Sequence, residues 1–357
     1  MRTKKFLVPI ALFSLCTLAA CSAPETTESG AASGTTSKAE SSTGELNIAC
    51  SQQEDFCQKI TAAFEQETGI KSTYVRLGAG EVLARLQTTP GEFDVWSGGQ
   101  AENHLIANDR NQIEKYVSPA ASALPAEYND TDGIWSGFYT DSVGFCSNEK
   151  ELAAIDIKAP TSWDDLLDPA LKGKVSMPHP ATAGVGYMAM FTVNTLSDGD
   201  IDKTVDYFKK LNENVMQYSK SAASGTEMAG RGEVAVTVAL DSDCVKARES
   251  GFKDLSVTYP EEGTGYEVGA VSVLKDARNL ENAKKYMDWI LSTDAQDMYK
   301  DVPSFAAPTL PDASMGEAVP PQDDLNKVDW DLKAAADSRE EMIELFESDV
   351  SSSQSAK

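Results

Sequence analysis

The chain has 357 residues, of which 56 are Asp or Glu and 31 are Lys or Arg, so its formal net charge at pH 7 is −25. Such an acidic chain argues against nucleic-acid binding, because contact with a phosphate backbone requires clustered cations. The length is sufficient for two domains, each with its own hydrophobic core.

The first 21 residues have the parts of a secretion signal. Arg2, Lys4 and Lys5 precede an apolar run from Phe6 to Ala20, and small residues lead up to Cys21. The run is shorter than the ~20 residues that a membrane-spanning helix needs. A cysteine at this place resembles the lipobox of bacterial lipoproteins, which implies lipidation of Cys21. The alternative is an ordinary signal peptide followed by an unrelated cysteine.

Residues 22–44 are almost entirely Ser, Thr, Ala, Gly and Glu. Such a segment buries too little apolar surface to offset its ordering entropy, so we expect a flexible tether. A lipidated cysteine followed by a tether predicts a body held at the extracytoplasmic face of a cell membrane, on the periplasmic or extracellular side, without crossing it.

Four cysteines remain once Cys16 is removed with the signal and Cys21 is lipidated: Cys50, Cys57, Cys146 and Cys244. An even number in an oxidising compartment predicts disulfides. Three pairings are possible; the preferred one joins the near neighbours Cys50 and Cys57 and leaves Cys146 with Cys244. Zinc is the competing interpretation, but no CxxC or His-rich spacing supports it.

The first part of the body alternates strand and helix patterns. Ser51 and Glu54 have the spacing of a capping box, and Gly69 is a helix stop. The predicted elements are strands at 46–50, 71–76 and 93–96 and helices at 56–68 and around 82–86. This rhythm is typical of an α/β fold with an open parallel sheet.

The rhythm continues after Trp135. Residues 160–167 have the pattern of a loop that leads into a short helix. Val234–Leu240 is an apolar run typical of a strand buried on both faces. The other predicted elements are strands at 174–177 and 215–218 and helices at 205–211, 282–291 and 339–346.

Small and polar residues follow most of these strands. Ligands of open α/β sheets bind beyond the carboxyl ends of the strands, and small residues there let backbone N–H groups and helix starts approach an anion. The candidate loops are Ser51, 78–80, 97–99, 182–186, 221–225 and 241–243.

Three stretches carry a resemblance to a known family. They are 50–57 (CSQQEDFC), 161–173 (TSWDDLLDPALKG) and 262–267 (EGTGYE), the last leading into 277–285 (ARNLENAKK). With them the body from Leu46 to about Val350 resembles the extracellular solute-binding proteins of bacterial ABC importers. More narrowly, it resembles the group of ferric-ion and hexose-phosphate receptors.

The resemblance implies a two-lobe, periplasmic-binding-protein-like (type II) fold. Two crossover strands would join the lobes around a ligand cleft. Residues 45–140 and 269–357 would form lobe 1 and residues 141–268 lobe 2, with hinge passes at 137–144 and 267–271. The ligand would contact both lobes, and the closed form would be presented to permease subunits with their ATPase. A monomer is expected.

The resemblance also bears on the ligand. Ferric-ion relatives hold the metal through adjacent tyrosines after the buried strand of lobe 2, where this chain has Asp241, Ser242, Asp243 and Cys244. Sugar-phosphate relatives carry a His–Asp pair there, which falls on Ser242 and Asp243. We therefore expect a sugar phosphate or another small organophosphate, with ferric ion as the alternative and no resident cofactor or metal.

A phosphate requires hydroxyl and N–H donors, whereas polyol hydroxyls suit carboxylate acceptors. The predicted ligand-binding residues are Ser51, Gly78, Gly80, Ser97, Gly98, Gly99, Thr182, Gly184, Ser221, Ser224, Asp241, Asp243, Glu262 and Glu267. Arg76 is a further candidate for a phosphate contact. An extracellular enzyme acting on phosphate esters or sugars is the alternative from another class. The two histidines, His104 and His179, form no recognisable catalytic arrangement, so we predict no enzyme activity.

Overall fold

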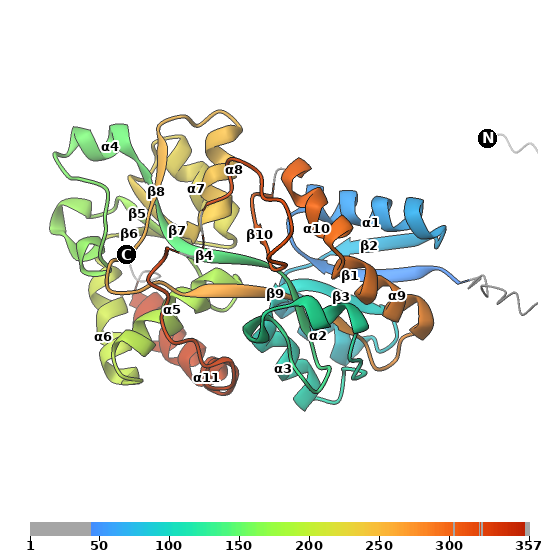
Figure 1. Cartoon of the computed structure of the whole chain (residues 1–357). Coiled ribbons are helices and arrows are strands. Elements are labelled where there is room, and N and C mark those ends of the chain that lie inside the picture. Colours follow the sequence, from blue (N-terminus) through green and yellow to red (C-terminus); the bar gives the residue numbers. More distant parts are fainter. Residues whose placement is uncertain (1–43, 303, 321, 323, 354–357) are drawn as a thin grey trace, which may run out of the picture. The chain divides into compact units, whose positions relative to one another are not determined.

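The computed structural model describes residues 44–353 except 303, 321 and 323. The predicted signal, the lipidation site Cys21 and nearly all of the predicted tether lie outside the described residues. Two lobes of strands and helices lie side by side, and two strands, β4 (Ser136–Asn148) and β9 (Tyr266–Val273), connect them (Figure 1).

The strands of the first lobe follow the predicted pattern. β1 (Leu46–Ser51) pairs in parallel with β2 (Ser72–Arg76) and with β3 (Val95–Gln100). β3 then pairs antiparallel with β9, and β9 antiparallel with β4. The sheet is therefore mixed rather than purely parallel, because the connecting strands run against their neighbours.

The strands of the second lobe extend the same sheet. β7 (Val236–Leu240) is antiparallel to β4 and parallel to β5 (Val175–Pro178), which pairs in parallel with β6 (Val215–Ser219). Two short strands, β8 (Leu255–Thr258) and β10 (Ala307–Pro308), also pair with β4. All thirteen residues of β4 are buried, which is consistent with a strand that has protein on every side.

The helices cover both faces of the sheet. They are α1 (Glu54–Thr68), α2 (Ala79–Thr88), α3 (Ala101–Asp109), α4 (Glu149–Ala154), α5 (Gly184–Leu196), α6 (Ile201–Leu211), α7 (Ala222–Gly230), α8 (Asp241–Glu249), α9 (Leu280–Ile290), α10 (Thr293–Asp297) and α11 (Leu332–Leu345). Short 3₁₀ turns lie at Pro119–Ala123, Ala126–Tyr128, Asp164–Leu167, Pro169–Leu171, Met298–Asp301 and Ser351–Ser353, and a π-helical turn at Phe346–Val350.

The two ends of α1 can be compared with the helix start and stop predicted from the sequence. Gly69 caps its C-terminus in the left-handed conformation (φ 71°), as predicted. The predicted capping box was wrong: Gln53 is the N-cap and its side chain makes no capping hydrogen bond. Ser51 instead accepts a hydrogen bond from the indole of Trp96 (Nε1–Oγ 2.9 Å).

Each lobe has its own hydrophobic core. In the first lobe, Phe56, Phe64, Tyr286 and Met287 pack with residues of β1 and β9. In the second lobe, helix α5, which is buried along almost its whole length, packs with β5, β7 and α6. Burial of these apolar side chains at ~25 cal/mol per Å² is the main stabilising contribution to each lobe.

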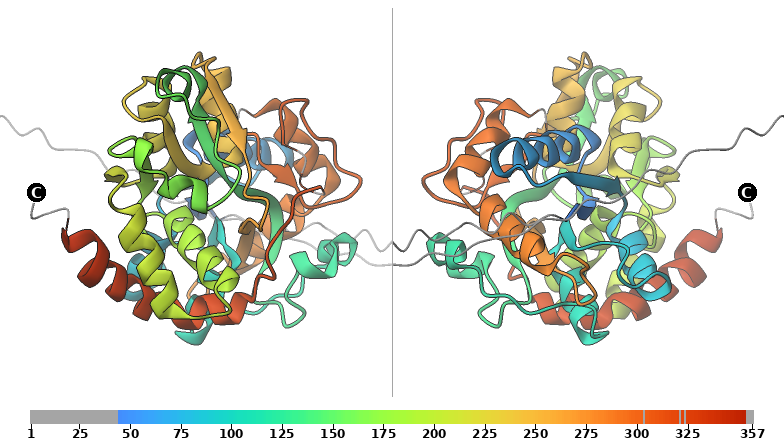
Figure 2. Two further views of the ribbon diagram at one scale, coloured as in Figure 1. Left: turned by 90° about the vertical axis from the view of Figure 1, so that its left-hand side faces the viewer. Right: turned by 90° about the vertical axis from the view of Figure 1, so that its right-hand side faces the viewer.

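The C-terminal segment packs on the second lobe. Val328, Trp330, Met342, Phe346 and Val350 belong to the same core as α5, and α11 lies beside α5 and α3 (Figures 1 and 2). This differs from the expected assignment of residues 269–357 to the first lobe. We propose that residues from 328 onward belong to the second lobe, while the boundaries at 140/141 and 268/269 stay predictions.

The chain therefore passes between the lobes a third time, after β10. Gln322 lies on this passage and is buried. Its side chain accepts a hydrogen bond from Ser142 Oγ (2.7 Å) and donates one to Asp241 Oδ2 (2.9 Å). The third passage is thus bonded to the connecting strand β4 and to the start of α8.

Candidate functional site

A cavity of about 970 Å³ lies between the lobes. This volume is at the upper end of the ~300–1,000 Å³ that is usual for small-molecule sites. The first lobe contributes residues 51–54, Arg76, 78–79, Glu81 and 99–100; the second contributes 182–185, 220–221, 223, 226–227, 240, 242–243, 246–247, 250 and 252; Tyr139 and Glu267 come from the connecting strands.

Six helices begin at this cavity. Lining residues lie at or beside the first residue of α1, α2, α3, α5, α7 and α8. The arrangement follows from the topology, because each of these helices begins near the carboxyl end of a strand. Helix starts present unpaired N–H groups and a partial positive charge, so their convergence favours an anionic group in the cavity.

The six helix starts differ in charge. α1, α2, α3 and α8 carry acidic residues in their first turn, whereas α5 and α7 carry none. α5 also lacks a side-chain cap, and the amide groups of Gly184 and Val185 have no acceptor among the described residues. The starts of α5 and α7, on the second lobe, are therefore the part of the wall best suited to an anion.

The unpaired charges at the cavity are positive. Each of its five carboxylates accepts a hydrogen bond or ion pair from the protein: Glu54, Glu81, Glu227, Asp243 and Glu267. Lys220, directly before the N-cap Ser221 of α7, has no such partner among the residues that the structure describes. Arg76 donates only through Nε, to the carbonyl of Gln52 (3.1 Å).

Side-chain amides and carboxyl groups from both lobes form another part of the wall. Gln100 Nε2 donates to Glu267 Oε2 (2.8 Å), and Gln53 Nε2 donates to Asp243 Oδ1 (2.7 Å). Burial raises the pKa of Glu267 to about 8 and that of Asp243 to about 6. These groups both donate and accept hydrogen bonds, as hydroxyl groups of a solute require.

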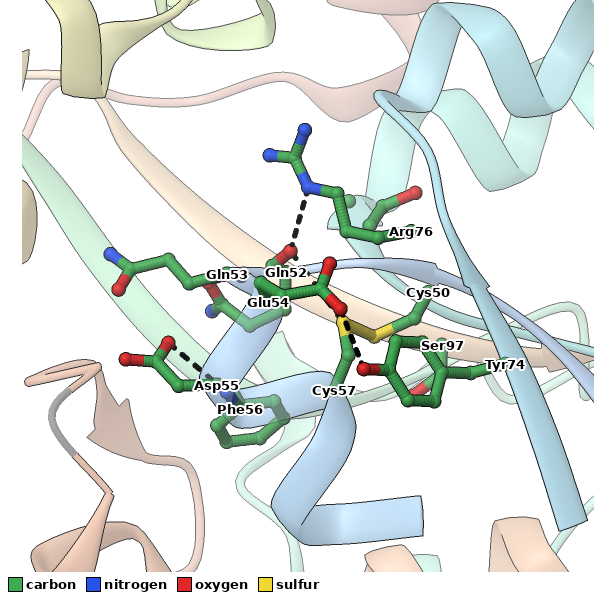
Figure 3. The surroundings of a disulfide bond; sticks show 12 residues. Cys50, Gln52, Gln53, Glu54, Asp55, Phe56, Cys57, Tyr74, Arg76 and Ser97 are labelled. Atoms are coloured by element: carbon green, nitrogen blue, oxygen red, sulfur yellow. Dashed lines mark hydrogen bonds between the residues drawn. A yellow bond between two sulfur atoms is a disulfide. The ribbon is translucent and has the colours of Figure 1, made fainter.

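Both disulfides of the preferred pairing are present, so this prediction is confirmed. Cys50 at the end of β1 is bonded to Cys57 in α1, and Cys146 in β4 to Cys244 in α8. Figure 3 shows that the first disulfide lies beside Gln52, Glu54 and Arg76, all of which line the cavity. Each disulfide fixes a helix start at the site to a strand of the sheet.

The cavity brings together eight of the fourteen predicted residues: Ser51, Gly78, Gly99, Thr182, Gly184, Ser221, Asp243 and Glu267. They come from both lobes and from β9, as the two-lobe expectation requires. Their contact with a ligand stays a prediction.

The other six, Gly80, Ser97, Gly98, Ser224, Asp241 and Glu262, do not line it. Ser97 bonds to Tyr286 (Oγ–OH 3.0 Å), and Ser224 donates to the carbonyl of Ser221. Asp241 is fully buried and accepts from Tyr259 (2.8 Å) as well as Gln322. Glu262 accepts from the amide of Trp163 (2.6 Å) and from Ser162 Oγ (2.9 Å).

Several polar residues of the cavity were not predicted, among them Gln53, Gln100, Lys220 and Lys246. Gln53 and Gln100 each directly precede a helix at the end of a strand region, which is a usable signal, but an uncharged amide has no motif of its own. Lys220 precedes the predicted loop 221–225 by one residue and could have been included with it.

Neither a metal cluster nor a membrane-crossing helix is found among residues 44–353 outside the three gaps. No group of three or more His, Cys, Asp or Glu side chains there is placed to hold a metal ion. No helix in this part of the chain combines the length and the apolar character that a bilayer span needs.

Comparison with known proteins identifies the family of this chain. Residues 100–334 match the family described as bacterial extracellular solute-binding protein. A protein of Haemophilus influenzae, named only as uncharacterized, is 32% identical over 317 residues, covering 86% of this chain and 91% of its own length. A putative 2-aminoethylphosphonate-binding periplasmic protein of Salmonella typhi is 28% identical over 265 residues, covering 71% of this chain and 73% of its own length.

A solved structure of a periplasmic binding protein is also similar to this chain. The periplasmic binding protein AfuA from Actinobacillus pleuropneumoniae, with fructose 6-phosphate bound, superposes with a TM-score of 0.82 at 32% identity. The match covers 87% of this chain and 99% of that protein. With a two-lobe fold and an interlobe cavity, this chain belongs to the bacterial extracellular solute-binding proteins, the receptors of ABC importers.

Proposed function

We propose that this protein captures a small phosphorylated organic solute, a sugar phosphate or another organophosphate, and delivers it to its permease. The supporting observation is the acid-free pair of helix starts at α5 and α7 beside the unpaired Lys220. A phosphate group at this place accepts hydrogen bonds from free N–H groups, from Ser221 and from the ammonium.

The amide and carboxyl groups of Gln53, Gln100, Asp243 and Glu267 suit the hydroxyl-bearing part of such a solute. The bound fructose 6-phosphate of AfuA and the named ligand of the Salmonella relative, 2-aminoethylphosphonate, both carry a phosphorus oxyanion on a small polar body. The net charge of −25 repels anions at long range. Screening over ~8 Å at physiological salt leaves the local donors dominant at the site.

Isothermal titration with fructose 6-phosphate, 2-aminoethylphosphonate, fructose and inorganic phosphate tests the proposal. We expect binding of at least one phosphorylated compound and none of fructose. Lys220→Met should weaken that binding about 10- to 150-fold, since a hydrogen bond to a charged group contributes about 1.5–3 kcal/mol. Lys158→Met is the matched control, because Lys158 is an exposed lysine outside the cavity.

Absence of binding by every phosphorylated compound, or equal affinities of Lys220→Met and wild type, would refute the proposal. The same titration with ferric citrate tests the alternative, for which binding with a visible charge-transfer band is the positive result. Turnover of a phosphate ester would instead indicate the enzyme alternative.

We also propose that the protein is a monomer held at the membrane by a lipid on Cys21, which lies outside the described residues. Mass spectrometry of the N-terminal peptide measures the acylation directly. Cys21→Ser should move the protein from the detergent phase to the aqueous phase in a phase-separation assay. A wild-type protein that stays in the aqueous phase would contradict the anchor.

A further inference from the structure

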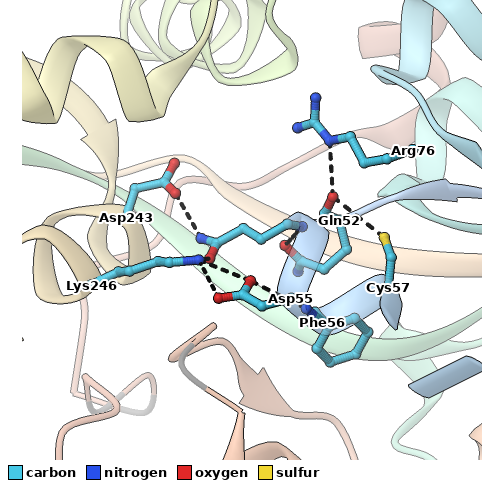
Figure 4. A network of polar contacts seen from close by, with 8 residues as sticks. Gln52, Asp55, Phe56, Cys57, Arg76, Asp243 and Lys246 are labelled. Carbon is cyan, nitrogen blue, oxygen red and sulfur yellow. Dashed lines mark hydrogen bonds and ion pairs between the residues drawn. The ribbon is translucent and has the colours of Figure 1, made fainter. Parts of the chain in front are cut away.

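Four polar residues join the lobes at the edge of the cavity. Gln53 is the N-cap of α1 and Asp55 lies in its first turn, whereas Asp243 and Lys246 lie in the first turns of α8. Figure 4 shows Asp55, Asp243 and Lys246. Gln53 Nε2 donates to Asp243 (2.7 Å), and Lys246 Nζ donates to Gln53 Oε1 (2.5 Å) and to Asp55 (2.8 and 2.9 Å). We call these four residues the interlobe bridge.

The two sides of the interlobe bridge belong to different lobes. On one side, Phe56 and Cys57 pack in the core of the first lobe; on the other, Cys244 and Ala247 pack in a core cluster of the second. The bridge therefore exists only while the lobes are together. Every hydrogen bond of the bridge joins one lobe to the other, so separation of α1 from α8 would break them.

Each side of the interlobe bridge is also covalently anchored. Cys57, two residues after Asp55, is bonded to Cys50 of β1. Cys244, between Asp243 and Lys246, is bonded to Cys146 of β4. The bridge residues are thus fixed to the sheet of their own lobes. Because both helix starts are held by a disulfide, they cannot shift along with the other lobe, and the hydrogen bonds between them oppose separation of the lobes.

The interlobe bridge also explains why Lys246, unlike Lys220, is not an unpaired cation of the cavity. This ammonium lines the cavity, yet its donors are directed to Gln53 and Asp55. Asp55 itself does not line the cavity. Its carboxylate thus has no direct contact with a bound solute and reaches the site only through Lys246 and Gln53.

We infer that Asp55 and Lys246 are positioning residues for solute capture: their ion pair holds the lobes closed and sets the fraction of protein in the closed form. The apparent dissociation constant is the intrinsic one divided by that fraction. A change at Asp55 therefore alters affinity without altering a contact of the solute. This inference holds for any solute and does not depend on the phosphorylated class proposed above.

Distances between spin labels on Gln66 and Lys158, introduced as non-cysteine residues, test it in solute-free protein. Both positions are exposed, one in each lobe. Asp55→Asn and Lys246→Met should each shift the distances to longer values, and the double variant should add little to either single change. Asp55→Glu should restore the wild-type distribution. Raising NaCl from 20 to 500 mM should open the wild type and leave Asp55→Asn unchanged, because salt screens the ion pair.

Lys209→Met is the matched control. It breaks an ion pair of similar exposure, Lys209–Asp349 (3.1 Å), that lies within the second lobe, so its distances should equal those of wild type. Asp55→Asn should also weaken fructose 6-phosphate binding about threefold or more without lowering the melting temperature. Identical distances in Asp55→Asn and wild type, or a wild type that is fully open at low salt, would overturn the inference. The distance measurement needs no solute, so its result is separate from that of the ligand titrations.

Discussion

The start of α5 approaches the first lobe so closely that one added methyl group should impair solute capture. A Cβ atom on Gly184 would lie 2.2 Å from Nε2 and 2.5 Å from Oε1 of Gln100, on the opposite lobe. Gln100 must then move. It would lose its hydrogen bond to Glu267 (2.8 Å) and the one it accepts from Asn103 Nδ2 (2.9 Å).

The expected magnitude follows from these bonds. Loss of a buried hydrogen bond costs about 1–3 kcal/mol, which corresponds to about a 5- to 150-fold weaker affinity. Gly184 and Gln100 lie in different lobes, so the clash arises only when the lobes close. We therefore expect Gly184→Ala to weaken fructose 6-phosphate binding by this factor while the melting temperature of the solute-free protein changes little.

Isothermal titration of three variants measures this effect. Gly80→Ala is the control, because a Cβ atom there meets nothing within 4 Å. Gly184→Ala is then introduced into a Gln100→Ala background, where the clash is gone, and should have no further effect. An equal loss of affinity with and without Gln100 would show that the methyl group obstructs the solute itself, which would refute the proposed mechanism.

Three further predictions concern stability. Burial raises the pKa of Glu102 to about 7 from an ordinary 4.5, so the folded state holds this proton more tightly than the unfolded state does. The unfolding free energy should therefore fall as pH rises from about 4.5 to 7. Glu102→Gln should remove this slope, a difference on the order of 3 kcal/mol above pH 7 that urea unfolding can measure. Replacement of Cys146 and Cys244 by Ser should lower the unfolding free energy by about 4–5 kcal/mol, because the disulfide spans 98 residues; a loss below 1 kcal/mol in urea unfolding would contradict this. Glu262→Ala, which removes the acceptor of the Trp163 amide outside the cavity, should cost about 1 kcal/mol of stability and leave solute affinity unchanged; a loss of affinity would place Glu262 in the ligand site.

Much of the fold could be predicted because its local patterns are strong. β1, α1, β2 and β6 lie within a residue or two of the predicted ranges, since alternation and helical periodicity are marked there. α5 was interpreted as a loop at its start because the helix is buried almost all round, which removes the amphipathic pattern. The start of α8 was interpreted as a polar turn because Asp241, Ser242 and Asp243 are common turn residues.

The site was harder to predict than the fold. β3 was expected to end at Trp96 but continues to Gln100, because Gly98 and Gly99 adopt positive φ angles beside an irregularity in its pairing with β9. This extension brings Gln100 to the cavity wall. The packing of residues 328–350 in the second core depends on contacts with segments over a hundred residues away, which no local pattern reports.

The return of the chain to the second lobe has a consequence for biogenesis. Met342, Phe346 and Val350 complete a core whose other members begin at Val143. That core stays unfinished until more than two hundred further residues have been synthesised. We therefore expect folding of the second lobe to wait until residues 342–350 have been synthesised. A fragment that ends before Trp330 should expose apolar surface and aggregate rather than yield a separate domain.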